Sequence, residues 1–157
     1  MPPITALVHT ENDALRVGRT LETLYACGDI LVVDHGSRDA TVRIAREYGA
    51  RIVDARIGAS PGQYLSATSS GWIFCLDPHE SLTENLAATL YEWKALPPAS
   101  GSFSVFLREE TAEGWIEVPT AQTRLIPADW SRWLGRLPVT DQCALALEGE
   151  LLRFSFP

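Results

Sequence analysis

Three short polar clusters each follow an apolar run, and they hold the residues best suited to chemistry. The clusters are residues 10–13, 34–39 and 77–80. If the apolar runs are neighbouring parallel strands, their carboxyl ends lie along one edge of a sheet, where open α/β folds bind ligands. That placement gathers six side chains around one crevice: Thr10, Asn12, Asp34, His35, Asp77 and His79.

Asp34 and Asp77 are the acids that most favour a functional role. Each ends an apolar run, where a carboxylate costs free energy unless it is hydrogen-bonded or binds a ligand. Asp13 and Asp39 are better explained as helix caps and turn formers. For Asp34 and Asp77 the alternative to a functional role is a structural one, in which they only tighten turns.

The spacing of apolar residues predicts the elements that position these clusters. Short apolar runs predict buried strands, and apolar residues three or four apart predict helices. Gly28, Gly49 and the pair Pro97–Pro98 are expected to end the helices. The predicted strands are 4–8, 30–33, 51–53 and 72–76, and the predicted helices are 14–25, 41–48, 63–70 and 82–93.

The sequence changes in character after Pro98. Residues 102–108 alternate like a half-exposed strand, and residues 115–118 can pair with them in a hairpin whose solvated tip is 108–110. Residues 122–126 and 151–156 are further candidate strands. The fold class predicted is α/β, with a mostly parallel sheet, helices on both faces and a small antiparallel addition.

Composition excludes several classes of function. The net charge of −7 argues against nucleic-acid binding, because phosphate contacts need clustered Lys and Arg. We see no apolar run of the ~20 residues that a membrane span needs, and residues 1–4 show no secretion signal. The three cysteines form no C-x-x-C pair, which favours buried, reduced thiols.

A dinucleotide-binding fold is the first comparison that this pattern invites. Such folds need a glycine-rich turn after the first strand, so that the backbone can approach a pyrophosphate. Residues 10–13 contain no glycine, which disfavours NAD. A nucleotidyltransferase would need Gly, Arg or Lys in the same loop and is disfavoured for the same reason.

Residues 6–13, 32–41 and 76–80 resemble family 2 glycosyltransferases of the GT-A fold, especially those of lipopolysaccharide core synthesis. The family typically shows T-K-N-E, V-V-D-S-G-S-T-D-x-T and L-D-A-D-E at these places. Residues 45–52 also fit, and a fainter likeness covers 123–126 and 133–136. The resemblance implies one domain over 1–157, with a nucleotide-binding half, 1–98, and a reduced acceptor-side half, 99–157.

The resemblance also implies roles for the clustered residues. Thr10 and Asn12 would line a nucleotide pocket, Asp34 and His35 would face the base and ribose, and Arg56 would supply positive charge to the diphosphate. The D-x-D element of the family would be Asp77 and His79. It would hold Mn²⁺ or Mg²⁺, with the adjacent Glu80 as a substitute ligand.

Four places depart from the family pattern. His35 replaces the loop acid of V-D-D-G-S relatives, and His79 replaces the second acid of D-x-D. Gly62–Gln63 replaces a K-N pair, and Pro138–Val139 replaces an H-E pair. The base that would deprotonate the acceptor is therefore open, with Asp141 and Glu148 as candidates.

We therefore expect a metal-assisted glycosyltransferase that uses a nucleotide sugar, foremost a UDP-sugar. Its acceptor is unknown, with a glycan or a lipid-linked molecule as options. The expected location is the cytoplasm, with peripheral contact to the inner membrane face as a further option. The alternative is a degenerate glycosyltransferase-like domain that binds a nucleotide or a protein without catalysis.

Overall fold

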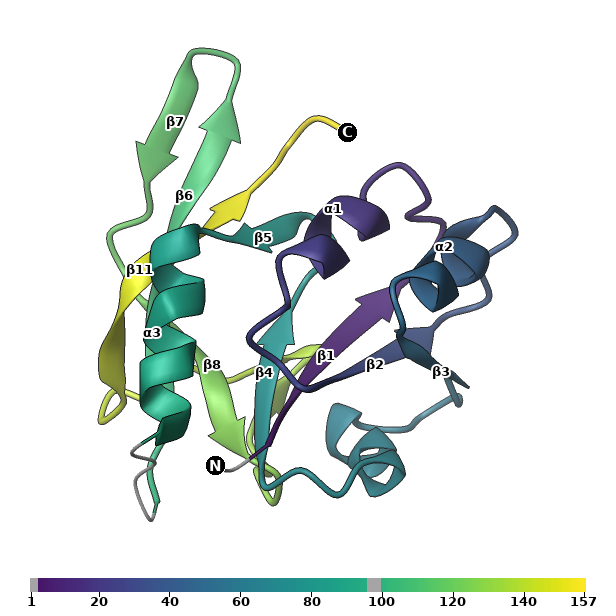
Figure 1. The fold of residues 1–157 in the computed structure, drawn as a ribbon, viewed down its shortest axis with the longest axis horizontal. Helices are drawn as coiled ribbons and strands as arrows, with labels where there is room; N and C mark the ends of the chain where they lie inside the picture. Colours follow the sequence, from purple (N-terminus) through teal and green to yellow (C-terminus); the bar gives the residue numbers. More distant parts are fainter. Residues whose placement is uncertain (1–2, 96–99) are drawn as a thin grey trace.

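The computed structural model describes residues 3–95 and 100–157, and its strands form one large sheet (Figure 1). The described strands of this sheet number nine, and a separate two-stranded hairpin lies beside it. The strands are β1 (Ile4–Thr10), β2 (Asp29–Asp34), β3 (Arg51–Asp54), β4 (Trp72–Leu76), β5 (Glu80–Leu82), β6 (Phe103–Thr111), β7 (Gly114–Glu117), β8 (Gln122–Pro127), β9 (Trp133–Leu134), β10 (Leu137–Pro138) and β11 (Leu145–Arg153). The helices are α1 (Val17–Glu22), α2 (Thr41–Glu47), α3 (Glu84–Ala95) and the 3₁₀ helix η1 (Pro61–Ala67).

The first half of the chain forms the parallel part of the sheet. Its strands lie in the order β3-β2-β1-β4, and each neighbouring pair is parallel. Crossovers through α1 and α2 connect β1 to β2 and β2 to β3, as the predicted βαβαβ order requires. These strands are rich in Val, Ile and Leu because both faces of this part of the sheet are covered.

The second half extends the same sheet beyond β4. β8 pairs antiparallel with β4, and β6, β11 and β5 follow in that order, while β7 forms a hairpin with β6. β6 and β11 are parallel to each other, whereas β8, β5 and β7 run antiparallel to their neighbours. The predicted fold class, a parallel sheet with an antiparallel addition, is therefore confirmed.

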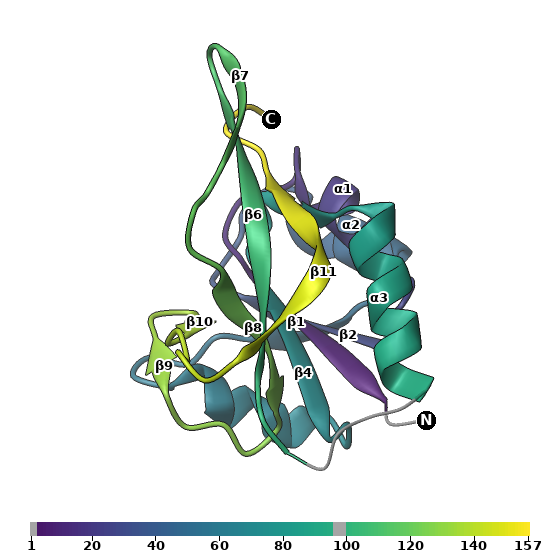
Figure 2. The same cartoon turned by 90° about the vertical axis from the view of Figure 1, so that its left-hand side faces the viewer.

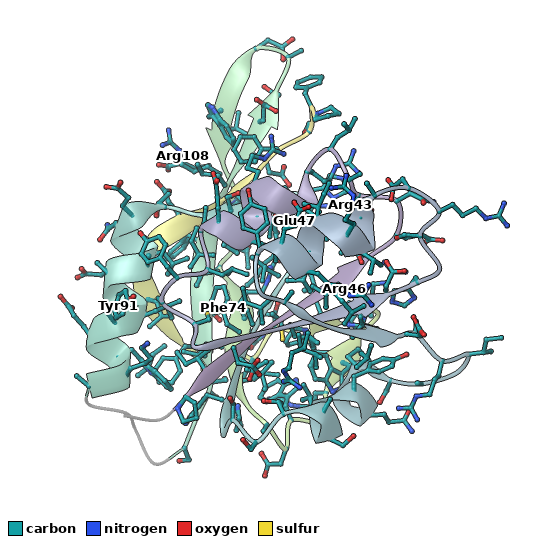
Figure 3. All side chains as sticks on the ribbon, turned by 45° about the vertical axis from the view of Figure 1, so that its right-hand side comes forward. Arg43, Arg46, Glu47, Phe74, Tyr91 and Arg108 are labelled. Carbon is teal, nitrogen blue, oxygen red and sulfur yellow. The ribbon has the colours of Figure 1, made fainter. Side chains whose placement is uncertain are left out.

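Two apolar layers cover the two faces of the sheet. Figure 2 shows α1, α2 and α3 on one face, with η1 and the β9–β10 hairpin on the other. Along β1, Ala6 and Val8 belong to the layer under the α-helices, and Leu7 belongs to the layer under η1. Phe74 of β4, labelled in Figure 3, lies in the interior and is fully buried in the first layer.

Several predicted boundaries are wrong, and each error has a local cause. The first helix begins at Val17 rather than at residue 14, because Asp13 bonds the Glu11 N–H and the Arg16 side chain in a tight turn. Leu82 lies in β5, where it pairs with Leu151, and α3 starts two residues later.

Other corrections concern the second half and the predicted helix at 63–70. That helix is the 3₁₀ helix η1, which begins at Pro61. Residues 108–110 are not a hairpin tip, since they lie in β6 and pair with β7. The last strand starts at Leu145 instead of Leu151. Pro97 and Pro98, which were expected to end a helix, lie outside the described residues.

The cysteines are all free thiols, but they differ in exposure. Cys27 and Cys75 are buried as predicted, and burial raises the pKa of each thiol to about 12. Cys143 is exposed, which contradicts the expectation that all three are buried. Among the described helices, we find none with the length and apolar character of a membrane span.

Candidate functional site at the strand ends

The polar clusters that follow β1, β2 and β4 meet at one edge of the sheet. Thr10 at the end of β1 pairs with Asp34 at the end of β2, and Val8 pairs with Leu76 at the end of β4. β1 therefore lies between the other two, so that the turns after β2 and β4 flank its end. The convergence predicted from the strand pattern is confirmed at the level of the backbone.

Asp34 organises the turn after β2. Its carboxylate accepts hydrogen bonds from the Thr10 hydroxyl at 2.8 Å, the Ser37 hydroxyl at 2.6 Å and the Ser37 N–H at 2.9 Å. The residue is only 5% exposed. Burial raises the pKa of Asp34, but the hydrogen bonds from Ser37 and Thr10 outweigh it, so the pKa lies below its ordinary value. Asp34 is thus a charged carboxylate that holds the turn together.

Asn12 links the turn after β1 to the turn after β2. Its backbone N–H donates to the Ser37 hydroxyl at 2.9 Å, and its side-chain oxygen accepts from the Arg38 N–H at 2.8 Å. Its φ of 54° lies in the left-handed region, which asparagine tolerates better than most residues. The two turns therefore form one hydrogen-bonded unit before any ligand arrives.

His9 and His35 form a second unit on the same edge. The Nδ1 atom of His9 lies 2.9 Å from Nε2 of His35, and the His9 ring lies edge-on to Tyr64. His35 also lines an open hollow of about 330 Å³ together with Gly36, Ala55, Arg56 and Ile57. That volume lies at the lower end of the roughly 300–1,000 Å³ typical of ligand pockets.

The two units face opposite sides of the sheet. Side chains alternate along a strand, so Thr10 follows Val8 to the side of the α-helices, and His9 follows Leu7 to the side of η1. By the same alternation Asp34 shares the side of Val32. Of the predicted nucleotide-binding residues, the structure therefore brings His35 and Arg56 to one hollow, while Thr10, Asn12 and Asp34 shape the adjoining turns.

Arg56 is held at the mouth of the hollow. Its backbone N–H donates to the Tyr64 hydroxyl at 2.9 Å, and its guanidinium lies 5.4 Å from the centre of the Tyr64 ring. A guanidinium nitrogen also donates to the Gln63 carbonyl at 3.4 Å. Arg56 is exposed, so a ligand can reach its charge.

Asp77 and His79 form a compact pair after β4. The Asp77 Oδ1 atom lies 2.5 Å from His79 Nδ1 and accepts the His79 backbone N–H at 2.9 Å. Each side chain is about one-third exposed. Burial raises the pKa of Asp77, but the hydrogen bonds from His79 and the charge of Arg153 together lower it by more. The pKa therefore lies below its ordinary value. Asp77 is therefore charged at neutral pH and reachable from solvent.

Glu80 is not available as a metal ligand in this arrangement. Its carboxylate is fully buried, with Oε1 at 2.6 Å from Arg124 Nη1 and Oε2 at 2.8 Å from Arg124 Nη2. Oε1 also accepts the Asp77 N–H at 2.8 Å, and Arg153 donates to Oε2 at 3.3 Å. Glu80 thus stabilises the turn that carries Asp77 from the protein interior, and we do not count it among the candidate metal ligands.

Arg136 is a residue of this edge that the sequence reasoning missed. It lies in the turn of the β9–β10 hairpin, 3.8 Å from the Glu11 carboxylate, just beyond the end of β1. Its charge contributes to lowering the pKa of His35, after burial, which is the larger cause. The signal was the Leu134-Gly135-Arg136-Leu137 stretch, since a glycine in a two-residue loop is typical of a tight hairpin.

The two candidate bases lie in different surroundings. Asp141 accepts bonds from the Cys143 N–H and the Ser102 hydroxyl and lies 3.2 Å from Arg132, which together lower its pKa. Its own N–H donates to Thr123 of β8, the neighbour of β4. Glu148 is exposed on β11, which β8 and β6 separate from β4. The structure therefore does not bring the two acids together.

Known structures share this fold. No family model matches the chain. Glucosyl-3-phosphoglycerate synthase from Mycobacterium tuberculosis, solved with Mn²⁺, UDP and glucosyl-3-phosphoglycerate, superposes with a TM-score of 0.55 at 18% identity. The match covers 68% of this chain and 44% of the synthase. The same enzyme with Mg²⁺ and UDP gives a TM-score of 0.54. The fold is thus that of GT-A glycosyltransferases.

The chain is also similar in sequence to curated proteins that are named glycosyltransferases. An uncharacterized glycosyltransferase of Rickettsia felis is 33% identical over 90 residues, which cover 55% of this chain and 32% of the relative. Lipopolysaccharide core biosynthesis glycosyltransferase LpsC of Rhizobium meliloti is 29% identical over 102 residues, 57% of this chain and 36% of that protein. The predicted resemblance is confirmed, and the chain spans about a third of these relatives' length.

Proposed function

We propose that this chain binds a nucleotide sugar at the strand-end site and transfers the sugar to an acceptor, as a glycosyltransferase of family 2. The observation that carries the proposal is the position of two pairs of polar side chains on either side of β1. His35 follows β2 and Arg56 follows the neighbouring β3, whereas Asp77 and His79 follow β4 on the other side of β1. A nucleotide sugar whose nucleobase binds at the first pair and whose diphosphate binds at the second would span the end of β1.

Arg136 supports this arrangement because it supplies a positive charge beside the end of β1. Its guanidinium stands near Glu11, directly after β1, where a diphosphate bridging the pairs would pass. A diphosphate needs cationic partners, and the family's K-N pair is replaced here by Gly62–Gln63. We assign Arg136 this role, with Arg56 closer to the base and ribose.

The residues after β4 fit a divalent cation in part. The Asp77 carboxylate and the His79 imidazole are both accessible, although no group of three His, Cys, Asp or Glu side chains in the described residues forms a complete metal cage. Catalytic cations of this kind take several ligands from substrate phosphates and water. One carboxylate and one imidazole suit Mn²⁺ better than Mg²⁺. The cation would neutralise the charge that develops on the diphosphate leaving group.

The acceptor half of the proposed reaction needs a base. The acceptor hydroxyl must lose a proton as its oxygen attacks the sugar. Asp141 lies between β10 and β11, where its N–H is hydrogen-bonded to Thr123 of β8, the strand next to β4, whereas Glu148 lies on β11. We therefore prefer Asp141 as the base. A glycan or lipid-linked acceptor, a cytoplasmic location and the division into a donor half, 1–98, and an acceptor half, 99–157, belong to the same proposal.

Titration calorimetry with UDP tests the proposal. UDP should bind in the presence of Mn²⁺, and Asp77→Asn should weaken that binding at least tenfold. Asp129→Asn is the matched control, because Asp129 is exposed and lies near Gly71, at the opposite end of β4. If UDP gives no heat with Mn²⁺ at millimolar concentration, the proposed donor site is wrong.

A binding domain without catalysis is the second candidate, and one observation favours it. Of the two carboxylates that follow β4, Glu80 is buried and bound to Arg124 and Arg153, so Asp77 is the one that solvent can reach. Restoring the second acid with His79→Asp separates the two functions. A weakened enzyme should gain Mn²⁺-dependent hydrolysis of UDP-glucose, whereas a binding domain should show none in either form.

A further inference from the structure

The contact between His9 and His35 requires that one of the two facing ring nitrogens carries a proton and the other does not. His9 Nδ1 and His35 Nε2 lie 2.9 Å apart, which is a hydrogen-bond distance. Burial is the main cause that lowers the pKa of His9 to about 3 and also lowers that of His35, so both rings are neutral at pH 7. One nitrogen must therefore donate and the other accept, and the choice determines the tautomer of both rings.

The other nitrogen of His9 decides between the two arrangements. His9 is 5% exposed, and its Nε2 atom is buried with no hydrogen-bond partner among the described residues. If that atom carried the proton, an N–H donor would be left unsatisfied in the apolar layer beside Tyr64, whose ring centre lies 5.9 Å away. Orphaned buried N–H donors are rarer than orphaned acceptors, and a ring face is a weak acceptor.

We propose that His9 is a positioning residue that carries its proton on Nδ1 and so fixes His35 in the tautomer with Nδ1–H. His35 Nε2 then accepts from His9, and the second ring nitrogen of His35 becomes a hydrogen-bond donor at the hollow it shares with Arg56. The hollow therefore offers donors from both side chains. The alternative tautomer would instead give His35 a bare acceptor nitrogen there.

This assignment determines the ligand chemistry that the hollow accepts, and in this respect it rests on the proposed function. A donor at His35 selects a base with a carbonyl oxygen at the facing edge, as uracil has, over one with an amino group there, as cytosine has. UDP should therefore bind roughly tenfold more tightly than CDP, the effect of one well-placed hydrogen bond. His9 contributes to this selectivity although it need not touch the nucleotide.

Two-bond ¹H–¹⁵N correlation spectra of the ¹⁵N-labelled full chain at pH 7 test the tautomer directly. The spectra distinguish protonated from unprotonated ring nitrogens, and His9→Gln and His35→Gln variants assign the signals. We expect Nδ1 protonated and Nε2 bare on both rings. A proton on Nε2 of His9 would overturn the proposal, and this result does not depend on any nucleotide.

Calorimetry with UDP and CDP in Mn²⁺ tests the selectivity. His9→Phe removes the donor to His35 and should bring the UDP:CDP preference close to one, whereas His9→Gln, which can still donate, should keep most of it. An unchanged preference in His9→Phe contradicts the positioning role. If neither nucleotide binds the wild type, the selectivity claim falls with the proposed function, while the spectra still decide the tautomer.

Discussion

Arg124 and Glu80 form a fully buried, two-bond ion pair directly beneath the turn that carries Asp77. The Arg124 side chain is 1% exposed and that of Glu80 is 0% exposed. Arg124 also donates to the Cys75 carbonyl at 3.2 Å, and Glu80 accepts the Asp77 N–H at 2.8 Å. The pair therefore joins β8 to the end of β4 and determines where Asp77 stands.

Breaking this pair should strongly destabilise the protein. Arg124→Met leaves the Glu80 carboxylate buried, with Arg153 at 3.3 Å as its remaining cationic partner among the described residues. We expect a loss of about 3–5 kcal/mol in the free energy of unfolding. Urea denaturation followed by circular dichroism measures it. A loss below about 1 kcal/mol would show that the pair contributes little to the folded state.

The double variant Glu80→Leu/Arg124→Met should be more stable than Arg124→Met alone, because it removes the uncompensated buried charge. It should nevertheless weaken Mn²⁺-dependent UDP binding, since the Asp77 N–H loses its acceptor. If the single and double variants were equally stable, the loss of stability in Arg124→Met would come from the changed side-chain volume and not from the unpaired charge of Glu80.

Stability should fall in mildly acidic solution because of His9. Its pKa lies at about 3 in the folded protein and near 6.5 when unfolded. The unfolded state therefore binds more protons between these values. The stabilisation is complete above pH 6.5 and is lost as the pH falls toward 3, by up to about 1.4 kcal/mol per pH unit.

The same measurement on His9→Phe isolates this contribution. Asp29 and Asp34 have pKa values already below 3.8, so their contributions are lost only under more acidic conditions. Between pH 6.5 and 4.5 the wild type should lose roughly 2 kcal/mol, and His9→Phe should lose much less. Parallel curves for the two proteins over this range would contradict a buried, neutral His9.

Arg136→Gln should weaken binding of UDP but not of uridine. The guanidinium is assigned to the diphosphate, so its loss should raise the Kd for UDP roughly tenfold, as for other charge-assisted hydrogen bonds. Calorimetry at two salt concentrations should also show a weaker salt dependence in the variant. Arg43→Gln is the control, because Arg43, labelled in Figure 3, lies on α2 and pairs with Glu47 at 2.9 Å.

An equal loss for UDP and uridine in Arg136→Gln would point to a disturbed hairpin instead of a lost phosphate contact. Gly135, beside Arg136, has a φ of 63°, so the turn depends on this glycine and not on the arginine side chain. A change of Arg136 alone should therefore leave the hairpin in place.

The parallel half of the fold could be predicted because each of its strands is marked locally. Runs such as Leu31–Val33 and Ile73–Leu76 are apolar on both faces, and a helix pattern follows most of them. Since the ends of parallel strands align, the convergence of the turns after β1, β2 and β4 at one edge followed from the sequence as well. The prediction needed no knowledge of long-range pairing.

The rest depends on contacts between distant segments. Leu82 was assigned to a helix because its pairing with Leu151 of β11 cannot be recognised locally. The division of the edge into a Thr10–Asp34 side and a His9–His35 side became visible only from the two core layers. Arg136 reaches the site because Trp133 and Leu137 pack beneath the sheet with Tyr64 and Leu65.

A crystal structure of the protein, from crystals soaked with UDP and Mn²⁺, tests whether the strand-end site binds a nucleoside diphosphate. We predict density for the base beside His35 and Arg56, the diphosphate near Arg136, and an anomalous Mn²⁺ peak at Asp77. Mn²⁺ and UDP bound away from the ends of β2 and β4, or a nucleotide that leaves Asp77 and His35 without contact, would show that the donor site lies elsewhere.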